Sequence, residues 1–440
     1  MDKPLRKVLI ITYYWPPSGG AGVQRWLKFV KYLRESGWEP VIYTPENPEF
    51  PAIDESLAKD IPENIEIVKT RIWEPYRFYK KLIGAGKNER INAGFLSEKK
   101  RPGMAERVSI WLRGNFFIPD ARKFWIKPSV KFLLKYLKSH PVDAIVSTGP
   151  PHSMHMIALG IKRKTGLPWL ADFRDPWTNI DFYHELMLTA WADRKHHRQE
   201  LSVLKEADEV VVISRSMKTD FIKIYDRDYS VITNGYDSED VAGVNVSLDT
   251  KFSIAHIGTM VKTRNPEALW KALGDEVSAN EGFASVLEIK LVGSVDYSVT
   301  NSIEKAGLSR FVNRIPYIPH NEVVSIQQQS QVLLLLINDT PNAKVILPGK
   351  FFEYMAAQRP VLCIGPADGD AAQVIAETNA GFVAGINDEA AIRSAIRELY
   401  QRFITGNNSV DSQGVEKYSR KQLTGEMAAR LTELVNRGQK

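Results

Sequence analysis

The residues best placed for chemistry lie in one short stretch in the second half of the chain. Pro348 and Gly349 form a turn between two apolar runs that predict strands, and a short helix is predicted after the turn. Lys350 stands at the start of that helix, where unpaired amide groups and the helix dipole favour an anion. Glu353 follows about one turn later, placed to accept hydrogen bonds from two hydroxyls. A phosphate beside a ribose fits this layout; the alternative is a capped surface helix whose Lys350 and Glu353 face water.

A second group of charges follows an apolar run in the first half. Asp172, Arg174 and Asp175 place three charges within four residues after a predicted buried strand. Unpaired charge is costly there, so these side chains must face a cleft or pair with one another. Contact with a substrate and a structural Asp–Arg pair are both open. His152, in the loop after the preceding strand, is a further candidate for contact with a transferred sugar, although a single loop histidine is often incidental.

A glycine-rich loop follows the first apolar run. Gly19, Gly20 and Gly22 would let backbone amides approach a phosphate closely, and a plain tight turn is the alternative. A dinucleotide fingerprint would need a third glycine where this chain has Arg25, and an acid closing the second strand, where Pro45 stands. The pattern therefore argues against a nicotinamide site.

Alternating strands and helices must position these residues. Short apolar runs, each followed by a helix or polar loop, predict parallel strands buried on both faces. In the first half they cover residues 8–11, 40–44, 144–147, 169–171 and 209–213, and in the second half 253–257, 288–292, 312–315, 332–337, 361–364 and 380–384. Such alternation is typical of doubly wound α/β sheets, whose polar loops meet at the carboxyl ends of the strands.

A chain of 440 residues is too long for one ordinary core, and two Rossmann-like domains are predicted. We expect an N-terminal domain over residues 1–242, with an insertion at about 73–138, and a C-terminal domain over residues 243–418. An amphipathic helix covers residues 419–440, and one arrangement open to it is a return to the N-terminal domain.

The composition is that of a soluble globular enzyme, with 44% hydrophobic and 25% charged residues. The single cysteine, Cys363, excludes a disulfide within the chain and favours a reducing, cytoplasmic location. No apolar run is long enough to cross a bilayer, and the first residues lack the layout of a signal peptide. The formal charge of +6 suits an anionic ligand or an anionic membrane but does not by itself indicate nucleic acid.

The insertion mixes basic and aromatic residues in a way that can bind an anionic membrane interface. The alternative is a helix pair that packs its aromatic side chains on the core and leaves its lysines in water. The residues concerned are Arg107, Arg113, Arg122, Lys123, Lys127, Lys131, Lys135 and Lys138, with Trp111, Phe116, Phe117, Phe124, Trp125 and Phe132.

Taken together, these motifs resemble those of the retaining GT-B glycosyltransferases of the large GT4 family, also called glycosyltransferase group 1. The resemblance covers nearly the whole chain and is weakest in the insertion. It depends on the order and spacing of six segments: 19–22, 172–177, 200–214, 234–237, 258–259 and 350–354.

The resemblance implies that the C-terminal domain binds a nucleoside-diphosphate sugar. Arg264 and Lys350 match the family's two cations on the diphosphate, with Lys262 as a possible substitute for Arg264. Glu353 matches the glutamate that binds the ribose, whereas Val345 stands where the family has a first glutamate that contacts the donor sugar. Further donor contacts are expected from Gly19, Gly20, Gly22, Gly258, Thr259, Pro348 and Gly349, with Tyr317 and Ile318 beside the base.

The resemblance also implies the reaction. We expect a retaining transfer, through front-face attack, from a nucleoside-diphosphate sugar such as a UDP-sugar to a glycan or lipid-linked acceptor in cell-surface polysaccharide biosynthesis. Arg264, Lys350, Asp172, Arg174, Asp175 and His152 are the candidate catalytic residues. No metal or other cofactor and no nucleic acid is expected. A non-hydrolysing sugar-nucleotide epimerase and a catalytically silent sugar-nucleotide binding module are the alternatives.

Overall fold

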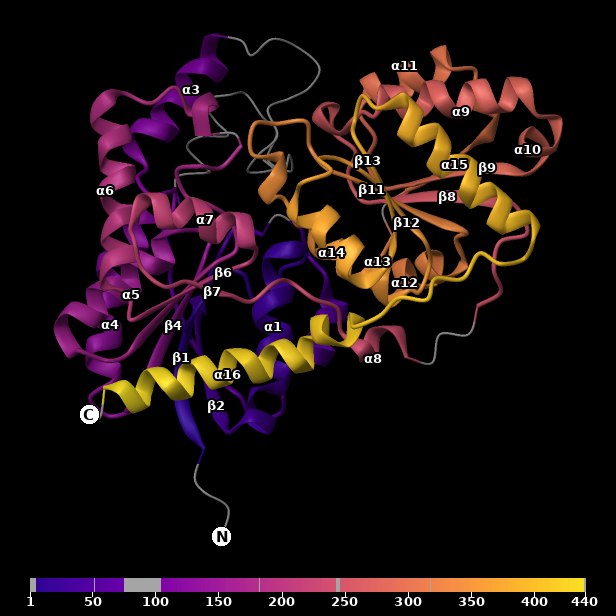
Figure 1. Ribbon diagram of the computed structural model, residues 1–440. Coiled ribbons are helices and arrows are strands. Elements are labelled where there is room, and N and C mark those ends of the chain that lie inside the picture. Colours follow the sequence, from indigo (N-terminus) through magenta and orange to yellow (C-terminus); the bar gives the residue numbers. More distant parts are fainter. Residues whose placement is uncertain are drawn as a thin grey trace. The chain divides into compact units, whose positions relative to one another are not determined.

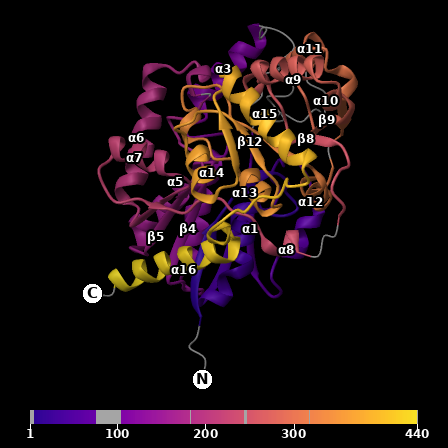
Figure 2. The same ribbon diagram turned by 45° about the vertical axis from the view of Figure 1, so that its right-hand side comes forward.

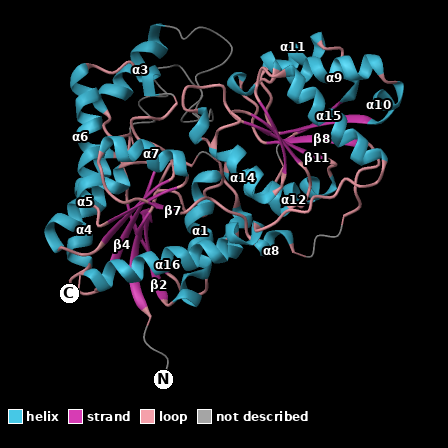
Figure 3. Cartoon of the chain, viewed as in Figure 1, coloured by secondary structure: helices cyan, strands magenta, loops and turns pink. Residues whose placement is uncertain are grey.

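The computed structural model describes residues 5–50, 52–74, 104–181, 183–242, 246–316 and 318–438. Its contacts divide the chain into two compact units. Unit 1 comprises Met1–Thr233 and Arg420–Lys440, and unit 2 comprises Asn234–Ser419. Each unit is built on a parallel sheet with helices on both faces (Figure 3), so the predicted α/β class with two Rossmann-like sheets is confirmed.

The sheet of unit 1 has seven parallel strands among the described residues, in the order β3-β2-β1-β4-β5-β6-β7. The direction of the strand order changes between β1 and β4, and ligands of doubly wound sheets bind at the carboxyl ends of the strands beside such a point. The bounds are β1 Arg6–Ile11, β2 Trp38–Pro45, β3 Glu66–Thr70, β4 Ala144–Gly149, β5 Trp169–Phe173, β6 Glu209–Val212 and β7 Ser230–Val231.

Helices cover both faces of this sheet. One face carries α4 Lys123–Tyr136, α5 Ser153–Thr165, α6 Ala190–Glu206 and α7 Arg215–Ile224, and α3 Met104–Phe116 contacts α6 (Figure 1). The opposite face carries α1 Ala21–Leu33 and α16 Arg420–Arg437, which lie side by side (Figure 2). The predicted C-terminal helix therefore belongs to unit 1, because its apolar side chains complete the core over α1.

The sheet of unit 2 has six parallel strands within the described ranges, in the order β10-β9-β8-β11-β12-β13, and its order changes direction between β8 and β11. The strands are β8 Phe252–Ile257, β9 Leu287–Val292, β10 Val312–Ile315, β11 Val332–Leu336, β12 Val361–Ile364 and β13 Gly381–Ala384. The helices are α8 Ser238–Val241, α9 Glu267–Ala279, α10 Glu281–Val286, α11 Tyr297–Lys305, α12 His320–Gln329, α13 Gly349–Ala356, α14 Asp370–Thr378 and α15 Glu389–Ile404.

The division between the units falls after Thr233, whereas the sequence suggested residue 242. The segment that follows is held by unit 2, because the Gln328 side chain donates to the Val241 carbonyl over 3.3 Å and α8 contacts α12. The short helix α8 thus lies at the expected domain boundary. β3 has no counterpart in the predicted strands, and α6 begins at Ala190, where Thr189 caps it.

The insertion matches the core-packing alternative only in part. Trp125 on α4 is buried and stacks on Tyr43 of β2 with ring centroids 4.9 Å apart. Other aromatic residues of the segment are exposed, and residues 75–103 lie outside the described part of the chain. Among the described helices, none has the length and apolar character needed to span a bilayer.

Candidate functional site

The predicted helix after Pro348 is confirmed as α13, which begins at Gly349. Its apolar side chains, Phe351, Phe352, Tyr354 and Met355, are buried against the sheet. This packing turns Lys350 and Glu353 away from the core, where both are partly exposed. Local sequence therefore fixes the first two residues of the candidate site.

The amino group of Lys350 is held at the end of β8. Its Nζ donates to the Ile257 carbonyl over 3.0 Å and lies 3.3 Å from Nε2 of His256. The buried His256 ring places Nδ1 3.1 Å from the Leu334 carbonyl, which can only accept. Nδ1 must then carry the proton, and Nε2 accepts from Lys350. The same α13 turn is fixed by Tyr354, whose hydroxyl accepts from the Ile257 amide over 3.0 Å.

This environment destabilises the charged form of Lys350. Desolvation and the nearby Arg264 lower the pKa of Lys350 to about 7, and Glu353 opposes that shift. Burial, followed by the charge on Lys350, holds the pKa of His256 well below its usual range. A neutral histidine thus lies beneath a lysine whose charged form a bound anion would stabilise.

Arg264 approaches the same region from the loop after β8. It ends the short 3-10 helix Lys262–Arg264, its Nε donates to Oδ1 of Asn338, and its Nη1 donates to the Thr259 carbonyl over 3.2 Å. Lys262 is exposed. Because Asn338 and the Thr259 carbonyl anchor Arg264, it is the better positioned of the two cations.

The loop that carries these cations begins with Gly258. Its φ of +114° is a backbone conformation that favours glycine, and its amide donates to the Val292 carbonyl over 2.8 Å. A Cβ added there would lie 3.7 Å from Nζ of Lys350, which is ordinary contact. The sequence therefore needs glycine at 258 for the turn, not for space.

Glu353 lies one turn beyond Lys350. Its Oε2 accepts from Nε2 of the fully buried Gln327 over 3.3 Å, and among the described residues the structure gives Oε1 no donor. Ile318, predicted to flank a base, packs partly on the core of unit 2, and Tyr317 lies outside the described residues. Val345 ends a short 3-10 helix and brings no carboxylate.

In unit 1 the glycine-rich loop joins β1 to α1. Gly20 has φ +89° directly before the helix, and the Gly19 amide donates to the Ala52 carbonyl over 2.9 Å. A Cβ at Gly22 would lie 2.7 Å from Cδ2 of Tyr14, so close packing requires glycine there. These contacts fit the tight-turn alternative.

The position of Asp172 corrects its prediction as a contact for substrate. Its carboxylate is fully buried and pairs with Arg25 on α1 over 2.8 Å. It also accepts from Trp26 Nε1 over 2.7 Å and from the Thr148 hydroxyl over 2.9 Å. Desolvation raises the pKa of Asp172, but Arg25 and these hydrogen bonds outweigh that effect and lower it. Asp172 therefore fastens α1 to the sheet, and its partner Arg25 was not among the predicted site residues.

Arg174 and Asp175 have different surroundings. Arg174 is nearly buried and donates to two carbonyls, that of Gly22 in the first turn of α1 over 2.6 Å and that of Pro150 in the loop after β4. It thereby ties the start of α1 to the loop after β4 and does not pair with Asp172. Asp175 is exposed, and desolvation by the surrounding protein still raises its pKa to about 6. Of the three predicted charges in unit 1, Asp175 is the one that reaches solvent.

His152 lies at the start of α5, stacked on Trp177 with centroids 4.4 Å apart. Burial is the main cause that lowers the pKa of His152 and takes that of His155 to about 3, so both are neutral. Nδ1 of His152 and Nε2 of His155 have no hydrogen-bond partner among the described residues. A Cβ at Gly149 would lie 3.0 Å from the first and 2.5 Å from the second, so both face one point. His155 was missed from sequence because it lies within a helix like an ordinary core residue.

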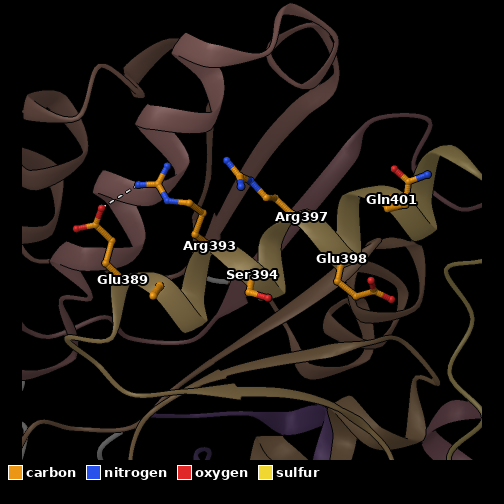
Figure 4. Close-up of a pocket in the computed structure, with 7 residues that line it drawn as sticks. Glu389, Arg393, Ser394, Arg397, Glu398 and Gln401 are labelled. Carbon is orange, nitrogen blue, oxygen red and sulfur yellow. Dashed lines mark hydrogen bonds and ion pairs between the residues drawn. The ribbon is translucent and has the colours of Figure 1, made fainter.

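An open hollow of about 800 Å³ also lies along α15 (Figure 4). Its two cations are already compensated: Arg393 pairs with Asp275 over 2.6 Å, and Arg397 pairs with Glu276 over 2.8 Å. None of the predicted site residues lines this hollow. It is a surface feature separate from the site around Lys350.

Comparison with known proteins identifies both halves of the chain. Residues 94–240 match the model of Glycosyltransferase Family 4, and residues 251–402 match that of Glycosyl transferases group 1. No curated protein matches the sequence.

Solved structures share the fold over nearly the full length. A glycosyltransferase from Rickettsia africae is 14% identical with a TM-score of 0.63, covering 98% of this chain and 99% of its own. WaaG, a glycosyltransferase involved in lipopolysaccharide biosynthesis, is 14% identical with a TM-score of 0.52, covering 98% of both chains. TarM from S. aureus, in complex with UDP and saccharide ligands, is 11% identical with a TM-score of 0.56, covering 98% and 100%. The chain is a GT-B glycosyltransferase that joins a Glycosyltransferase Family 4 domain to a glycosyl transferases group 1 domain.

Proposed function

We propose that the chain is a retaining glycosyltransferase that moves a sugar from a nucleoside-diphosphate donor, a UDP-sugar, to a glycan or lipid-linked acceptor in cell-surface polysaccharide biosynthesis. The proposal needs no metal or organic cofactor and places the enzyme in the cytoplasm, at the inner face of the membrane. The observation that carries it is the position of Lys350: a lysine with a pKa of about 7, at the start of α13 and held against the end of β8.

The proposed chemistry follows from the charges in unit 2. As the bond between the sugar and the diphosphate breaks, negative charge builds on the leaving phosphate oxygen. Lys350 and Arg264 would stabilise that charge more strongly in the transition state than in the bound donor. The backbone N–H groups of Gly349 and Lys350 at the start of α13 would add a partial positive charge. Glu353 would accept hydrogen bonds from the ribose through Oε1.

The acceptor hydroxyl would enter on the face from which the phosphate leaves and pass its proton to a phosphate oxygen. His152, and Asp175 as the exposed acid of unit 1, are the proposed contacts for the sugar and the acceptor. Arg174 and Asp172 would act by holding the loops that carry them. The choice of UDP is supported by the UDP complex of TarM, and the choice of pathway by the role of WaaG in lipopolysaccharide synthesis.

The test is incubation of the purified protein with a panel of UDP- and GDP-sugars, followed by chromatography of nucleotides and sugars. Release of UDP from one UDP-sugar, at a rate that rises with an added acceptor, is the expected result, and an anomeric configuration kept in the product supports retention. Inversion at a sugar carbon without nucleotide release would identify an epimerase. Thermal stabilisation without any turnover would identify a binding module.

A further inference from the structure

The outer face of α4 carries a row of lysines that have no acidic partner in the described part of the chain. Lys127, Lys131, Lys135 and Lys138 are all exposed, and no aspartate or glutamate occurs between residues 121 and 142. Lys127, Lys131 and Lys135 lie four residues apart along one stripe of α4, and Lys138 follows in the turn after the helix ends at Tyr136. Among the described residues, none of the four forms an ion pair. Like charges at this spacing repel, so the stripe weakens the helix unless an anion lies against it.

The exposed helix α15 of unit 2 is a useful contrast. There Glu389 pairs with Arg393 over 2.8 Å (Figure 4). Glu398 pairs in the same way with Arg402, four residues further on, over 2.9 Å. Such pairs are what an exposed helix ordinarily uses in water. The stripe on α4 departs from that pattern, which indicates an external anionic partner.

Exposed aromatic side chains lie at the N-terminal end of the same stripe. Trp73 is 62% exposed and packs edge-to-face on Phe124 at 4.9 Å, and Phe124 is itself 43% exposed. Lys123 joins this group to α3, since its Nζ donates to the Phe116 carbonyl. Phe116 is 54% exposed and packs on the exposed Trp111 at 5.7 Å. The exposed rings thus continue from α4 to the end of α3, as expected of an interaction surface.

The core does not require these rings. The opposite side of α4 buries Trp125 and Leu133 over the sheet, and α4 packs on α5, where Gly160 allows close approach to Val130. The helix therefore has one face for the core and a second face that is both aromatic and cationic.

We propose that this second face, Lys127, Lys131, Lys135 and Lys138 with Trp73, Trp111, Phe116 and Phe124, docks on an anionic lipid bilayer. Aromatic side chains favour the headgroup level of a bilayer, where lysines alongside them meet anionic headgroups. A soluble polyanion would use the lysines but would leave exposed apolar surface unexplained. Single-stranded nucleic acid could use both, and is an outcome of the test.

The test is co-sedimentation of the full chain with vesicles of phosphatidylcholine alone and of phosphatidylcholine with phosphatidylglycerol in equal parts. Binding to the anionic vesicles only is expected. Lys131→Gln with Lys135→Gln should weaken it about 25-fold, since each lysine near an anionic surface contributes about fivefold. Lys251→Gln with Lys305→Gln removes the same charge from exposed positions in unit 2 and should have no effect. Equal binding by the two double variants would overturn the proposal.

Trp73→Ser separates a bilayer from a soluble polyanion. The variant should bind anionic vesicles several-fold more weakly, because an aromatic ring no longer enters the interface, and should keep its weak binding to heparin. If the substitution leaves vesicle binding unchanged, or if single-stranded DNA binds more tightly than the vesicles do, the bilayer proposal is wrong. Both readouts measure lipid binding without turnover, so they remain independent of the proposed transferase activity.

Discussion

The titration of Lys350 offers the sharpest test of the donor site. With a pKa of about 7, Lys350 is half protonated near neutral pH in the free protein. A bound diphosphate would stabilise the ammonium and raise that pKa, so binding should take up a proton above pH 7. UDP affinity should therefore fall as the pH rises from 7, because less of the free protein carries a charged Lys350.

The size of the effect can be worked out. At pH 8 only about one tenth of the free protein carries a charged Lys350, so binding should take up about 0.9 proton and the apparent Kd should be about fivefold weaker than at pH 7. The loss of UDP affinity should level off at high pH, where Lys350 is neutral in the complex as well. The total loss should then equal the contribution of the charged hydrogen bond from Lys350 to the phosphate, about 1.5–3 kcal/mol. Titration calorimetry with UDP at pH 7–9, in buffers of different ionisation enthalpy, measures both quantities where the UDP phosphates are already ionised.

Two variants identify the group that titrates. Lys350→Met should bind UDP weakly and take up no proton. Arg264→Gln should also weaken binding, but it removes the neighbouring cation that lowers the Lys350 pKa, so proton uptake should move to higher pH. Proton uptake that survives Lys350→Met, or a wild-type affinity that is flat from pH 7 to 9, would refute this account of the site.

Three further predictions concern single groups. Glu353→Ala should weaken UDP binding by about 1–3 kcal/mol and abolish any preference for UDP over 2′-deoxy-UDP in calorimetry; a retained preference would refute the ribose contact. Asp172→Asn leaves Arg25 buried without its counter-charge and should lower the free energy of unfolding in urea by about 3–5 kcal/mol. The folded fraction of this variant should keep its turnover. Lost turnover at unchanged stability would instead place Asp172 at the substrate. His196 is a buried residue of α6 whose pKa burial lowers to about 4. This value and the pKa of about 3 for His155 lie below the unfolded value of about 6.5, so the unfolded chain binds more protons and stability must fall as the pH drops below 6.5. Each should contribute a slope approaching about 1.4 kcal/mol per pH unit between pH 6 and 4.5, and a double Gln variant with the same slope would contradict this.

Features that depend on residues close together in the sequence were largely predictable. Strand and helix periodicity was enough for the α/β class, and the spacing from Pro348 to Glu353 was enough to place a lysine and a carboxylate one turn apart on α13. Tertiary partners were not predictable in the same way. Arg25 lies 147 residues from Asp172, and nothing in either segment indicates the other. His256 is, by sequence, an isolated histidine in an apolar part of a strand, and only the approach of α13 to β8 gives it a role beneath Lys350.

The charged residues at 172–175 show why tertiary structure was needed to assign their contacts. From the sequence, they could face a cleft or pair with one another. In the structure each of them has different surroundings, and they do not act as one group. Asp172 and Phe173 are successive residues of β5 and so point to opposite faces, Asp172 to α1 and Phe173 to the core beneath α5. Arg174 then leaves the strand, and its two Nη atoms donate to the carbonyls of Gly22 and Pro150. Arg25 and Arg174 are thus both engaged by groups within unit 1. Under the proposed function, Lys350 and Arg264 of unit 2 stabilise the leaving phosphate, so variants of these two residues should lower turnover far more than variants of Asp172 do.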